Sequence, residues 1–358
     1  MQDDRRADAR DSIPVVVRAA SAEMSGTDDV RVSVAMATFN GARHLRAQLD
    51  SMVRQSMVPD ELVVSDDGST DETVEILDAF GATAPFAIRI LRGEGRLGVT
   101  GNFERAIAAC TGAFIILADQ DDEWMPDRVE RSIAALETSP EAGYAFSDAR
   151  IMNEDGSLQS DTLWTRIGLG DHRRRRYRSG EQVPTLLNGP NFIYGMAMTI
   201  RRAFLADVLP IAAHSPSCTH DTWTALTMSG SGHDGVMIDA CLVCYRQHAA
   251  QVVGAGGARA TTAAAVGRSL RSRRVFDPLF PDDLDLVADR IAGRSGTVVG
   301  RLRDADRIRA KATHLRVRER AASLPTTQRF ILVAREYFSG RYHDYSASWK
   351  TAVRDMLS

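Results

Sequence analysis

The sequence of 358 residues contains little cysteine and no long apolar run. Its four cysteines are too few and too unevenly spaced to staple a chain of this length, which favours ordinary buried thiols in a reducing compartment. One Cys-x-x-Cys pair, Cys241 and Cys244, lies inside an apolar run, and a single pair is weak support for a zinc or redox site. No stretch approaches the ~20 apolar residues of a membrane-spanning helix. We therefore expect a cytoplasmic protein that touches a membrane at most from its surface, at the inner face.

The sequence also lacks a strong charge of either sign. Its formal net charge is −3, which excludes a globally basic nucleic-acid-binding protein and gives no sign of an acidic tail. Residues 1–30 carry scattered charges and lack the apolar core of a secretory signal, so we expect a disordered leader, with Met24 as an alternative start. A charged ligand or partner must therefore be bound by a local group of charged residues rather than by the net charge of the whole chain.

Short apolar runs and amphipathic segments alternate from Val32 onward. The runs predict buried strands and the segments between them predict helices, an α/β pattern typical of a mostly parallel nucleotide-binding sheet flanked by helices. Further on, the sequence predicts a hairpin with its turn at 154–156, a helix that begins at 220 and a strand over 236–248. Beyond about residue 250 the chain is rich in Ala and Arg and predicts helices. We divide it into the leader (1–30), the α/β domain (31–255) and a helical C-terminal appendage (256–358).

Polar and acidic residues stand where three of the predicted strands end. Thr38, Asp67 and Asp119 lie at or just beyond carboxyl ends, where ligands of open α/β sheets bind, so we expect one convergent site. In "ADQDDEW" three aspartates and a glutamate fall within five residues, and their mutual repulsion suggests a bound cation. Asp119 and Asp121 would project to the same side of extended backbone, and carboxylate oxygen suits Mg²⁺ or Mn²⁺. A solvated acidic loop that caps the next helix is the alternative.

Six segments of the α/β domain follow one another in a recognisable order: "VSVAMATFNG", "ELVVSDDGSTDET", "ADQDDEWMPDRV", "FSDARIMNEDG", "HDTWTALTMSGSG" and "YRQHAAQVVG". Together they resemble family 2 glycosyltransferases of the GT-A fold, and within these the bacterial rhamnosyltransferase-like group. The resemblance covers residues 31 to about 255 and implies a GT-A type sheet that binds a nucleotide-diphosphate sugar.

The resemblance implies roles for the residues that would hold the nucleotide. Asp67 would accept a hydrogen bond from the imide N–H of uracil or thymine, helped by backbone groups near Ala37 and Thr38. Asp119 would lie near the ribose, and Arg246 would counter the charge of the diphosphate.

The resemblance also implies the metal site and the catalytic base. Asp121 would bind Mn²⁺ or Mg²⁺, which bridges the donor diphosphate and assists the leaving group, and His248 would offer an imidazole to the metal or the diphosphate. Asp221 would accept the proton of an acceptor hydroxyl that attacks the anomeric carbon with inversion. Capping of the helix that opens at "HDTW" is the alternative for Asp221, and both roles are compatible.

Two segments depart from the family pattern. Tyr194-Gly195 stands where a Thr-Gly pair is common, and Ala249 and Ala250 follow "YRQH" where relatives often have glycine and asparagine. Both departures lie where the donor sugar and acceptor would be held, so the sugar is left open.

Residues 171–178, "DHRRRRYR", form a dense basic segment. They are consistent with a solvated loop, or with a contact for an anionic acceptor or anionic membrane lipids, to which Arg271, Arg273 and Arg274 would add. No stacking aromatics accompany these arginines, which argues against an RNA partner.

We therefore predict a metal-dependent inverting glycosyltransferase. It would move a sugar from a UDP- or dTDP-sugar, dTDP-rhamnose being one candidate, to a hydroxyl of a cell-surface glycan or its lipid-linked precursor. A sugar-nucleotide nucleotidyltransferase is one alternative, although a Gly-rich loop with a basic residue is missing after the first strand. A catalytically inactive donor-binding subunit of a glycan assembly complex is the other. Whether the C-terminal helices contact a membrane or form a homodimer stays open.

Overall fold

The computed structural model describes residues 15–18, 31–93, 95–212, 218–249, 251, 279–293, 299–346 and 349–357. Arg271, Arg273, Arg274 and most of the predicted leader lie outside these residues. The expectation of disorder over 1–30 is wrong at Val15–Arg18, which form a short strand because they pair with β4 at the edge of the sheet.

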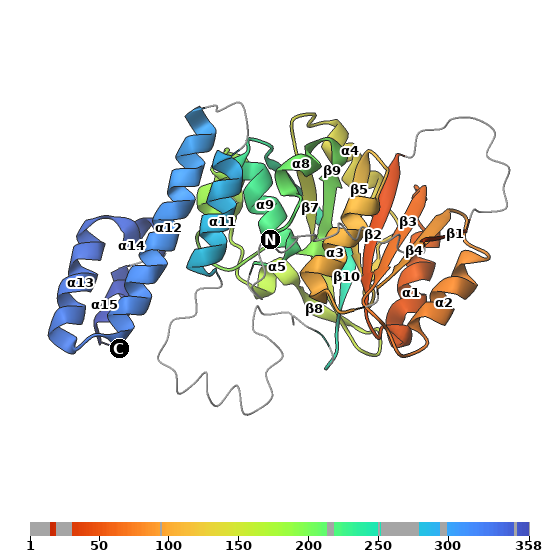
Figure 1. Ribbon diagram of the computed structural model, residues 1–358, viewed down its shortest axis with the longest axis horizontal. Coiled ribbons are helices and arrows are strands. Elements are labelled where there is room, and N and C mark those ends of the chain that lie inside the picture. Colours follow the sequence, from red (N-terminus) through yellow and green to blue (C-terminus); the bar gives the residue numbers. More distant parts are fainter. Residues whose placement is uncertain are drawn as a thin grey trace, which may run out of the picture.

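One sheet runs through the described chain (Figure 1), with its strands in the order β1-β4-β3-β2-β5-β9-β7-β10-β6 and β8 paired to β7 off this path. The strands are β1 (Val15–Arg18), β2 (Val32–Thr38), β3 (Glu61–Asp66), β4 (Ala87–Arg92), β5 (Phe114–Asp119), β6 (Glu123–Trp124), β7 (Tyr144–Asn153), β8 (Leu158–Thr162), β9 (Met198–Arg201) and β10 (Gly235–Gln247). β4, β3, β2 and β5 are mutually parallel, as the alternating pattern predicts. Beyond β5 the sheet is mixed, because β9 is antiparallel to β5 and β7, whereas β7 and β10 are parallel.

Helices cover both faces of this sheet (Figure 1). They are α1 (Ala42–Val53), α2 (Thr73–Gly81), α3 (Gly98–Ala109), α4 (Arg128–Glu137), α5 (Leu163–Arg166), α6 (Asp171–Arg178), α7 (Gln182–Leu186), α8 (Leu205–Val208), α9 (His220–Gly230), α11 (Pro281–Ala292), α12 (Val299–Ser323), α13 (Thr326–Phe338), α14 (Arg341–Tyr345) and α15 (Trp349–Leu357), with short 3-10 turns η1 (Gly195–Ala197) and η2 (Arg202–Phe204). The hairpin predicted around 154–156 is confirmed as the antiparallel pair of β7 and β8.

Alternate residues of the central strands face opposite sides of the sheet, as strand geometry requires. Val34, Val64 and Ile116 pack in one hydrophobic cluster with α1, α2 and α4. Ala35 and Leu117 belong to a second cluster, which also contains buried residues of α3, α9, α11 and α12. Burial on both faces explains why these strands are continuous apolar runs in the sequence.

The C-terminal helices are present as predicted, and they divide into two packing groups. α11 packs against α9 and, with the first half of α12, contributes buried side chains to the core of the sheet domain. The second half of α12 forms a separate small core with α13, α14 and α15, built around Ala321, Val333, Tyr342 and Ala352. The outer group therefore projects from the sheet domain on α12 (Figure 1).

All four cysteines are free, but only Cys110 and Cys218 are buried as expected, whereas Cys241 and Cys244 are half-buried. In the described part of the chain no helix has the length and apolarity needed to cross a membrane.

Candidate active site at the carboxyl ends of the strands

The loops that leave β2 and β3 are tied together by Asp66. Its carboxylate accepts hydrogen bonds from the hydroxyls of Thr38 (2.8 Å) and Ser69 (2.6 Å) and from the backbone N–H groups of Gly68 and Ser69. Gly68 has a φ of +81°, which glycine adopts without the strain of a side chain. Asp66 therefore holds a tight turn.

Asp67, predicted to contact the base, accepts hydrogen bonds at the start of α3. The backbone N–H of Leu97 donates to its Oδ1 (2.6 Å) and that of Gly98 to its Oδ2 (3.0 Å). A carboxylate at a helix N-terminus is stabilised by the unpaired amides and the helix dipole. The Thr38 carbonyl likewise accepts from the Asp67 backbone and from Asn102 Nδ2. Base binding by Asp67, Thr38 and the neighbouring Ala37 stays a prediction.

Asp121 meets His248 directly beyond the end of β5. The distance from Asp121 Oδ2 to His248 Nε2 is 2.7 Å, and the two side chains are 17% and 11% exposed. These residues are 127 positions apart in the chain and come together because β10 returns next to β6, which follows the acidic loop. The two predicted metal ligands are thus adjacent, offering one oxygen and one nitrogen.

Asp119 at the end of β5 is surrounded by other carboxylates. Its pKa is raised to about 7, first by burial and then by the negative charges of Asp121 and Asp221. The strand end, the acidic loop and the start of α9 therefore share one electrostatic environment.

The negative charge of the acidic loop is partly balanced by a buried arginine that sequence reasoning missed. Arg128, at the start of α4, is 1% exposed, donates to the Leu117 carbonyl (2.9 Å) and lies over the Trp124 ring at 4.1 Å. Burial lowers its pKa to about 9, although Asp122 and Asp119 oppose this. Asp122 is fully buried, and burial together with Asp121 and Asp119 raises its pKa. Nothing in the sequence around Arg128, which follows "MPD", indicates that its side chain points into the protein.

Arg246 holds the same loop from the other side. Its Nε donates to the Asp121 carbonyl (2.8 Å), Nη1 to the Glu154 carbonyl (3.2 Å) and Nη2 to Glu123 Oε1 (2.6 Å). Its backbone N–H donates to Asp122 Oδ1 at 2.9 Å. The guanidinium is 6% exposed and all three of its nitrogens bind the protein. The geometry thus favours positioning of the acidic loop over the direct diphosphate contact that was predicted.

Gln120 and His44 also belong to this site and were not singled out from the sequence. The Gln120 amide pairs with the backbone N–H and C=O of Phe39, at 2.9 and 3.0 Å, and so joins the loop after β2 to the acidic loop. His44, on α1, has its ring centroid 5.0 Å from that of His248. Only the position of Gln120 between two aspartates could have drawn attention to it.

Asp221 lies in the first turn of α9 and its carboxylate is fixed by three donors. Oδ1 accepts from the Thr219 hydroxyl and from the Thr222 backbone N–H (2.6 Å), and Oδ2 accepts from the Gly195 backbone N–H (3.0 Å). Thr219 rather than Asp221 occupies the N-cap position. The segment around Gly195, which departs from the family pattern, thus contacts the predicted base.

His220 packs beside Asp221 in a tight apolar setting. Its ring stacks on Phe103 with centroids 3.9 Å apart, and neither ring nitrogen has a hydrogen-bond partner among the described residues. Burial lowers its pKa, although the negative charge of Asp221 opposes the shift. A Cβ on Gly195 would lie 2.3 Å from His220 Nε2, and the close approach therefore requires glycine at 195.

The basic segment 171–178 is the helix α6, and most of its arginines bind the protein itself. Arg173 donates to the carbonyls of Pro190 (2.7 Å) and Thr185 (3.0 Å). Arg178 forms an ion pair with Asp239. The reading of this segment as a solvated loop is wrong, because these contacts and the buried Tyr177 anchor a helix. Its basic groups are largely committed within the fold.

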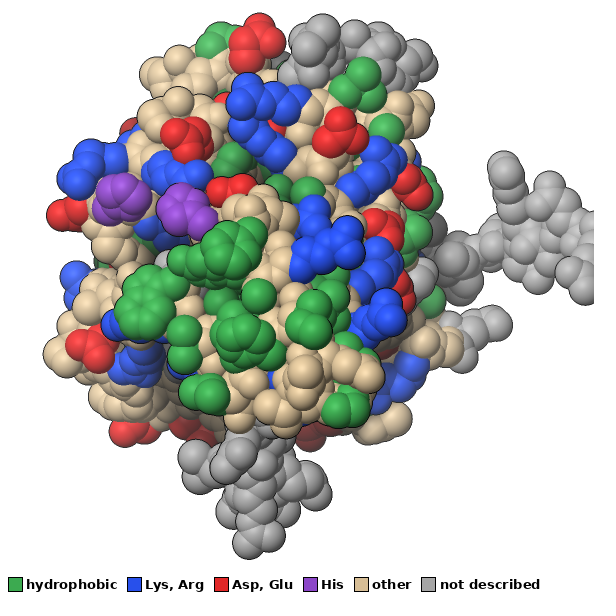
Figure 2. Space-filling model, turned by 90° about the vertical axis from the view of Figure 1, so that its left-hand side faces the viewer, with side chains coloured by type: hydrophobic (Ala, Val, Ile, Leu, Met, Phe, Trp, Pro, Cys, Tyr) green, Lys and Arg blue, Asp and Glu red, His purple; other side chains and the backbone are tan. Residues whose placement is uncertain are grey.

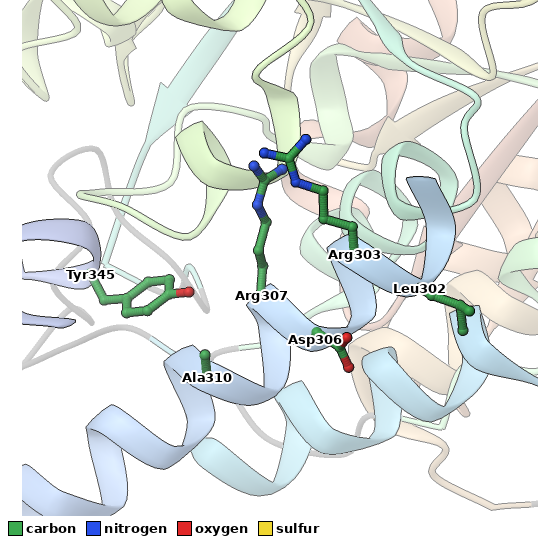
Figure 3. Close-up of a pocket in the computed structure, with 6 residues that line it drawn as sticks. All are labelled: Leu302, Arg303, Asp306, Arg307, Ala310 and Tyr345. Carbon is green, nitrogen blue, oxygen red and sulfur yellow. The ribbon is translucent and has the colours of Figure 1, made fainter. Parts of the chain in front are cut away.

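An open groove of about 560 Å³ lies elsewhere, along α12 and the end of α14 (Figure 3). Its lining residues Arg303 and Arg307 point the same way from α12, and Tyr345 faces them. Every lining residue belongs to the C-terminal helices, so the groove is separate from the strand-end site. Among the described residues, no three His, Cys, Asp or Glu side chains gather around one metal position.

Known proteins resemble this chain in sequence and in fold. Residues 33–206 match the family model described as Glycosyl transferase family 2. The uncharacterized protein Rv1520 of Mycobacterium tuberculosis is 26% identical over 225 residues, which are 61% of this chain and 59% of that protein. The dTDP-rhamnosyl transferase RfbG of Shigella flexneri is 36% identical over 105 residues, 28% of this chain and 36% of its own length. The structure of S. aureus TarS 1-349 in complex with UDP-GlcNAc has a TM-score of 0.52 at 16% identity, covering 85% of this chain and 79% of that one.

The sheet, its flanking helices and the structural match define a GT-A fold. Residues 33–206 match glycosyl transferase family 2, and the predicted family resemblance is confirmed over this part of the chain. The match to the M. tuberculosis relative spans 59% of that protein's length.

Proposed function

We propose that the protein is a metal-dependent inverting glycosyltransferase that uses a UDP- or dTDP-sugar. The acceptor would be a hydroxyl of a cell-surface glycan or of its lipid-linked precursor, at the inner face of a membrane. One observation carries the proposal: Asp119, Asp121, His248 and Asp221 gather at the carboxyl ends of the strands in a family 2 chain.

Asp121 and His248 fit a divalent ion. One carboxylate oxygen and one imidazole nitrogen lie 2.7 Å apart and both groups are partly open to solvent, so other ligand positions would remain for water and diphosphate oxygens. These two residues would hold Mn²⁺ or Mg²⁺, which would neutralise charge on the leaving diphosphate. Arg246 would act on this step through the loop that it holds.

Asp221 would be the catalytic base. Three donors fix its orientation, and a carboxylate has about four lone-pair sites, so one site remains for an acceptor hydroxyl. As that oxygen attacks the anomeric carbon opposite the nucleotide, the proton passes to Asp221 and the bond to the diphosphate breaks. A single displacement of this kind inverts the anomeric centre.

The nucleotide would lie over the ends of β2, β3 and β5. Asp67 would accept from the imide N–H of uracil or thymine with lone pairs that α3 leaves free, helped by backbone groups near Ala37 and Thr38, and Asp119 would lie near the ribose. The relative RfbG is named a dTDP-rhamnosyl transferase, which supports dTDP-rhamnose as the first donor to test.

The test is a donor screen with Mn²⁺ present. Purified protein is incubated with UDP-, dTDP- and GDP-sugars, and nucleoside diphosphate release and thermal shift are measured for wild type, Asp121→Asn and Asp221→Asn. We expect Asp121→Asn to lose metal-dependent donor binding. Asp221→Asn should bind the donor normally but turn over about 10²–10⁴-fold more slowly, because it lacks the base. Asp127→Asn, an exposed carboxylate of the same acidic segment, is the matched control and should behave as wild type.

Two results would contradict the proposal. A wild-type protein that neither binds nor hydrolyses any of these donors would not be the enzyme described. Diphosphate release from dTTP and a sugar phosphate would instead support a nucleotidyltransferase.

A further inference from the structure

The outer helices α13 and α15 expose an apolar face to solvent. On α13 the exposed members are Phe330 (55%), Ile331 (63%) and Phe338 (85%), and on α15 they are Trp349 (59%), Val353 (40%) and Leu357 (77%). Both sets follow helical spacing, and the two helices pack against each other. Figure 2 shows hydrophobic side chains gathered over this end of the molecule. We name these six side chains the apolar face. Exposed aromatic and aliphatic side chains in such a group mark an interaction surface.

Basic side chains border the apolar face on the same helices. Arg335 stands four residues after Ile331, while Lys350 and Arg354 follow Trp349 and Val353 directly. All three are exposed, and none forms an ion pair with another residue of the described chain. Figure 2 likewise shows Lys and Arg side chains around the hydrophobic group. The surface is therefore apolar at its centre and positive at its margin.

The charge of the C-terminal helices is opposite to that of the rest of the chain. Residues 299–357 contain 13 Lys and Arg against six Asp and Glu, whereas the whole chain has a net charge of −3. An anionic surface is therefore attracted to this end of the molecule and repelled by the remainder. On an anionic surface, this charge asymmetry would both attract the C-terminal helices and turn the rest of the molecule away from the surface.

We propose that the apolar face binds a membrane surface that contains anionic lipids. Phe, Trp and Leu side chains would enter the boundary between headgroups and acyl chains, and Arg335, Lys350 and Arg354 would meet the lipid phosphates. A two-fold dimer through the same face would instead bring Lys350 and Arg354 near the equivalent residues of the second copy, where like charges repel. The charge thus favours the membrane over a second copy of the chain.

This assignment differs from the one suggested by the basic segment 171–178. Arg173 and Arg178 in α6 already bind partners within the protein. The basic side chains that border the apolar face are exposed and stand next to exposed apolar side chains. Binding to a membrane surface concerns where the protein lies, and it holds whether or not the chain transfers a sugar.

The chain contains its own reporter for this contact. Of its four tryptophans, Trp124, Trp164 and Trp223 are 5%, 1% and 0% exposed, and Trp349 on the apolar face is 59% exposed. The full-length protein is mixed with vesicles of phosphatidylcholine alone or of phosphatidylcholine with phosphatidylglycerol. Flotation measures binding, while tryptophan emission and iodide quenching measure insertion. We expect binding to the anionic vesicles, a blue shift, and protection of Trp349 from iodide, all weakened by salt.

Variants divide the contact into its apolar and charged parts. Phe338→Ser combined with Leu357→Ser should weaken binding by about tenfold or more, because two large side chains no longer enter the bilayer. Lys350→Glu combined with Arg354→Glu should abolish the preference for anionic vesicles. The controls are Leu158→Ser, an apolar residue 48% exposed on β8, and Arg175→Glu, an exposed arginine of α6; both should bind as wild type. All these positions are exposed, so the variants should keep the wild-type melting temperature.

The proposal is overturned if the wild type does not float with anionic vesicles, or if the serine pair floats as well as the wild type. A dimer in sedimentation that dissociates in the serine pair, without vesicle binding, would assign the face to self-association. Loss of binding in Arg175→Glu alone would assign the contact to α6 instead.

Discussion

Two arginines offset the repulsion among the carboxylates of the acidic loop. The loop places Asp121, Asp122 and Glu123 in succession after Asp119, and like charges in low dielectric would otherwise oppose folding. Arg128 lies buried beneath it, and Arg246 binds two carbonyls and a carboxylate around it. The protein therefore carries fixed positive charges of its own, and Asp121 lies beside His248, where we propose an exchangeable cation.

Replacing Arg246 by methionine tests this positioning role. We expect the variant to lose about 2–3 kcal/mol of unfolding free energy, because it leaves buried acceptors without donors and removes the ion pair with Glu123. Urea unfolding measures the loss. The control is Arg92→Met, which breaks a half-exposed pair with Asp78 at 2.8 Å and should cost less than about 1 kcal/mol. If Arg246→Met kept full stability and lost only donor affinity, the guanidinium would act on the diphosphate directly.

At the scale of elements, the helices α12 to α14 are joined by a buried polar cluster. His314 Nδ1 lies 2.9 Å from Glu336 Oε1, and Arg341 donates to both oxygens of Glu336, at 2.8 and 2.9 Å. Burial lowers the pKa of His314 to about 4, although Glu336 opposes the shift. The Arg341 and His314 contacts hold the pKa of Glu336 below its ordinary value even though burial opposes them.

These shifts predict that the outer helices loosen in acid. The unfolded chain protonates His314 near its ordinary pKa of 6.5, whereas the folded chain does so near 4, so unfolding takes up a proton between these values. Stability is therefore full above about pH 6.5 and falls as the pH drops towards 4, by about 2 kcal/mol between pH 6.5 and 5. Melting followed by circular dichroism across this range checks the slope.

The comparison that isolates this effect is between His314→Gln and His343→Gln. His343 is 95% exposed in the same group of helices, so its replacement should leave the pH slope unchanged. His314→Gln should flatten it. Equal slopes in the wild type and His314→Gln would show that the acid sensitivity arises elsewhere.

At the scale of the whole molecule, the boundary between the sheet domain and its appendage lies later than the composition suggests. Leu284, Val287 and Ile291 of α11 are at most 1% exposed and belong to the core that contains α3 and α9. Ile291 packs so closely on α9 that a Cβ at Gly230 would lie 2.3 Å from its Cδ1. α11 and the first half of α12 are therefore part of the sheet domain.

Truncation tests this boundary. A chain that ends at residue 255 should be insoluble or lack a cooperative melt, because losing three buried apolar side chains removes about 1.5–3 kcal/mol each. A chain that ends at Val317 keeps α11 and the packed half of α12. It should melt cooperatively and bind nucleotide donors but not vesicles. A folded, donor-binding chain ending at 255 would restore the boundary drawn from composition.

Much of the fold could be predicted because its signals are local. Apolar runs with β-branched residues, helical spacing and turn residues depend on neighbours in the chain, and they locate β2, β3, β5, α9 and the β7–β8 hairpin. The meeting of the acidic strand ends could be predicted for the same reason, since parallel strands bring their carboxyl ends to one edge. The hydrogen-bond partners of Arg128, Arg246 and Asp67 could not be predicted, because these partners lie on strands and loops that are distant in the chain.

The sequence by itself determined most of the alternating strands and helices of the α/β domain, the family resemblance and the acidic edge, because each can be read from residues along the chain. Only the tertiary structure decided which groups are free to act. In "TTQRFILVAREYF" the sequence predicts a helix with apolar residues on much of its surface, yet Val333 is fully buried and Phe338 is 85% exposed. That choice depends on which side of α13 packs against α12 and α15, contacts that no local pattern of residues encodes.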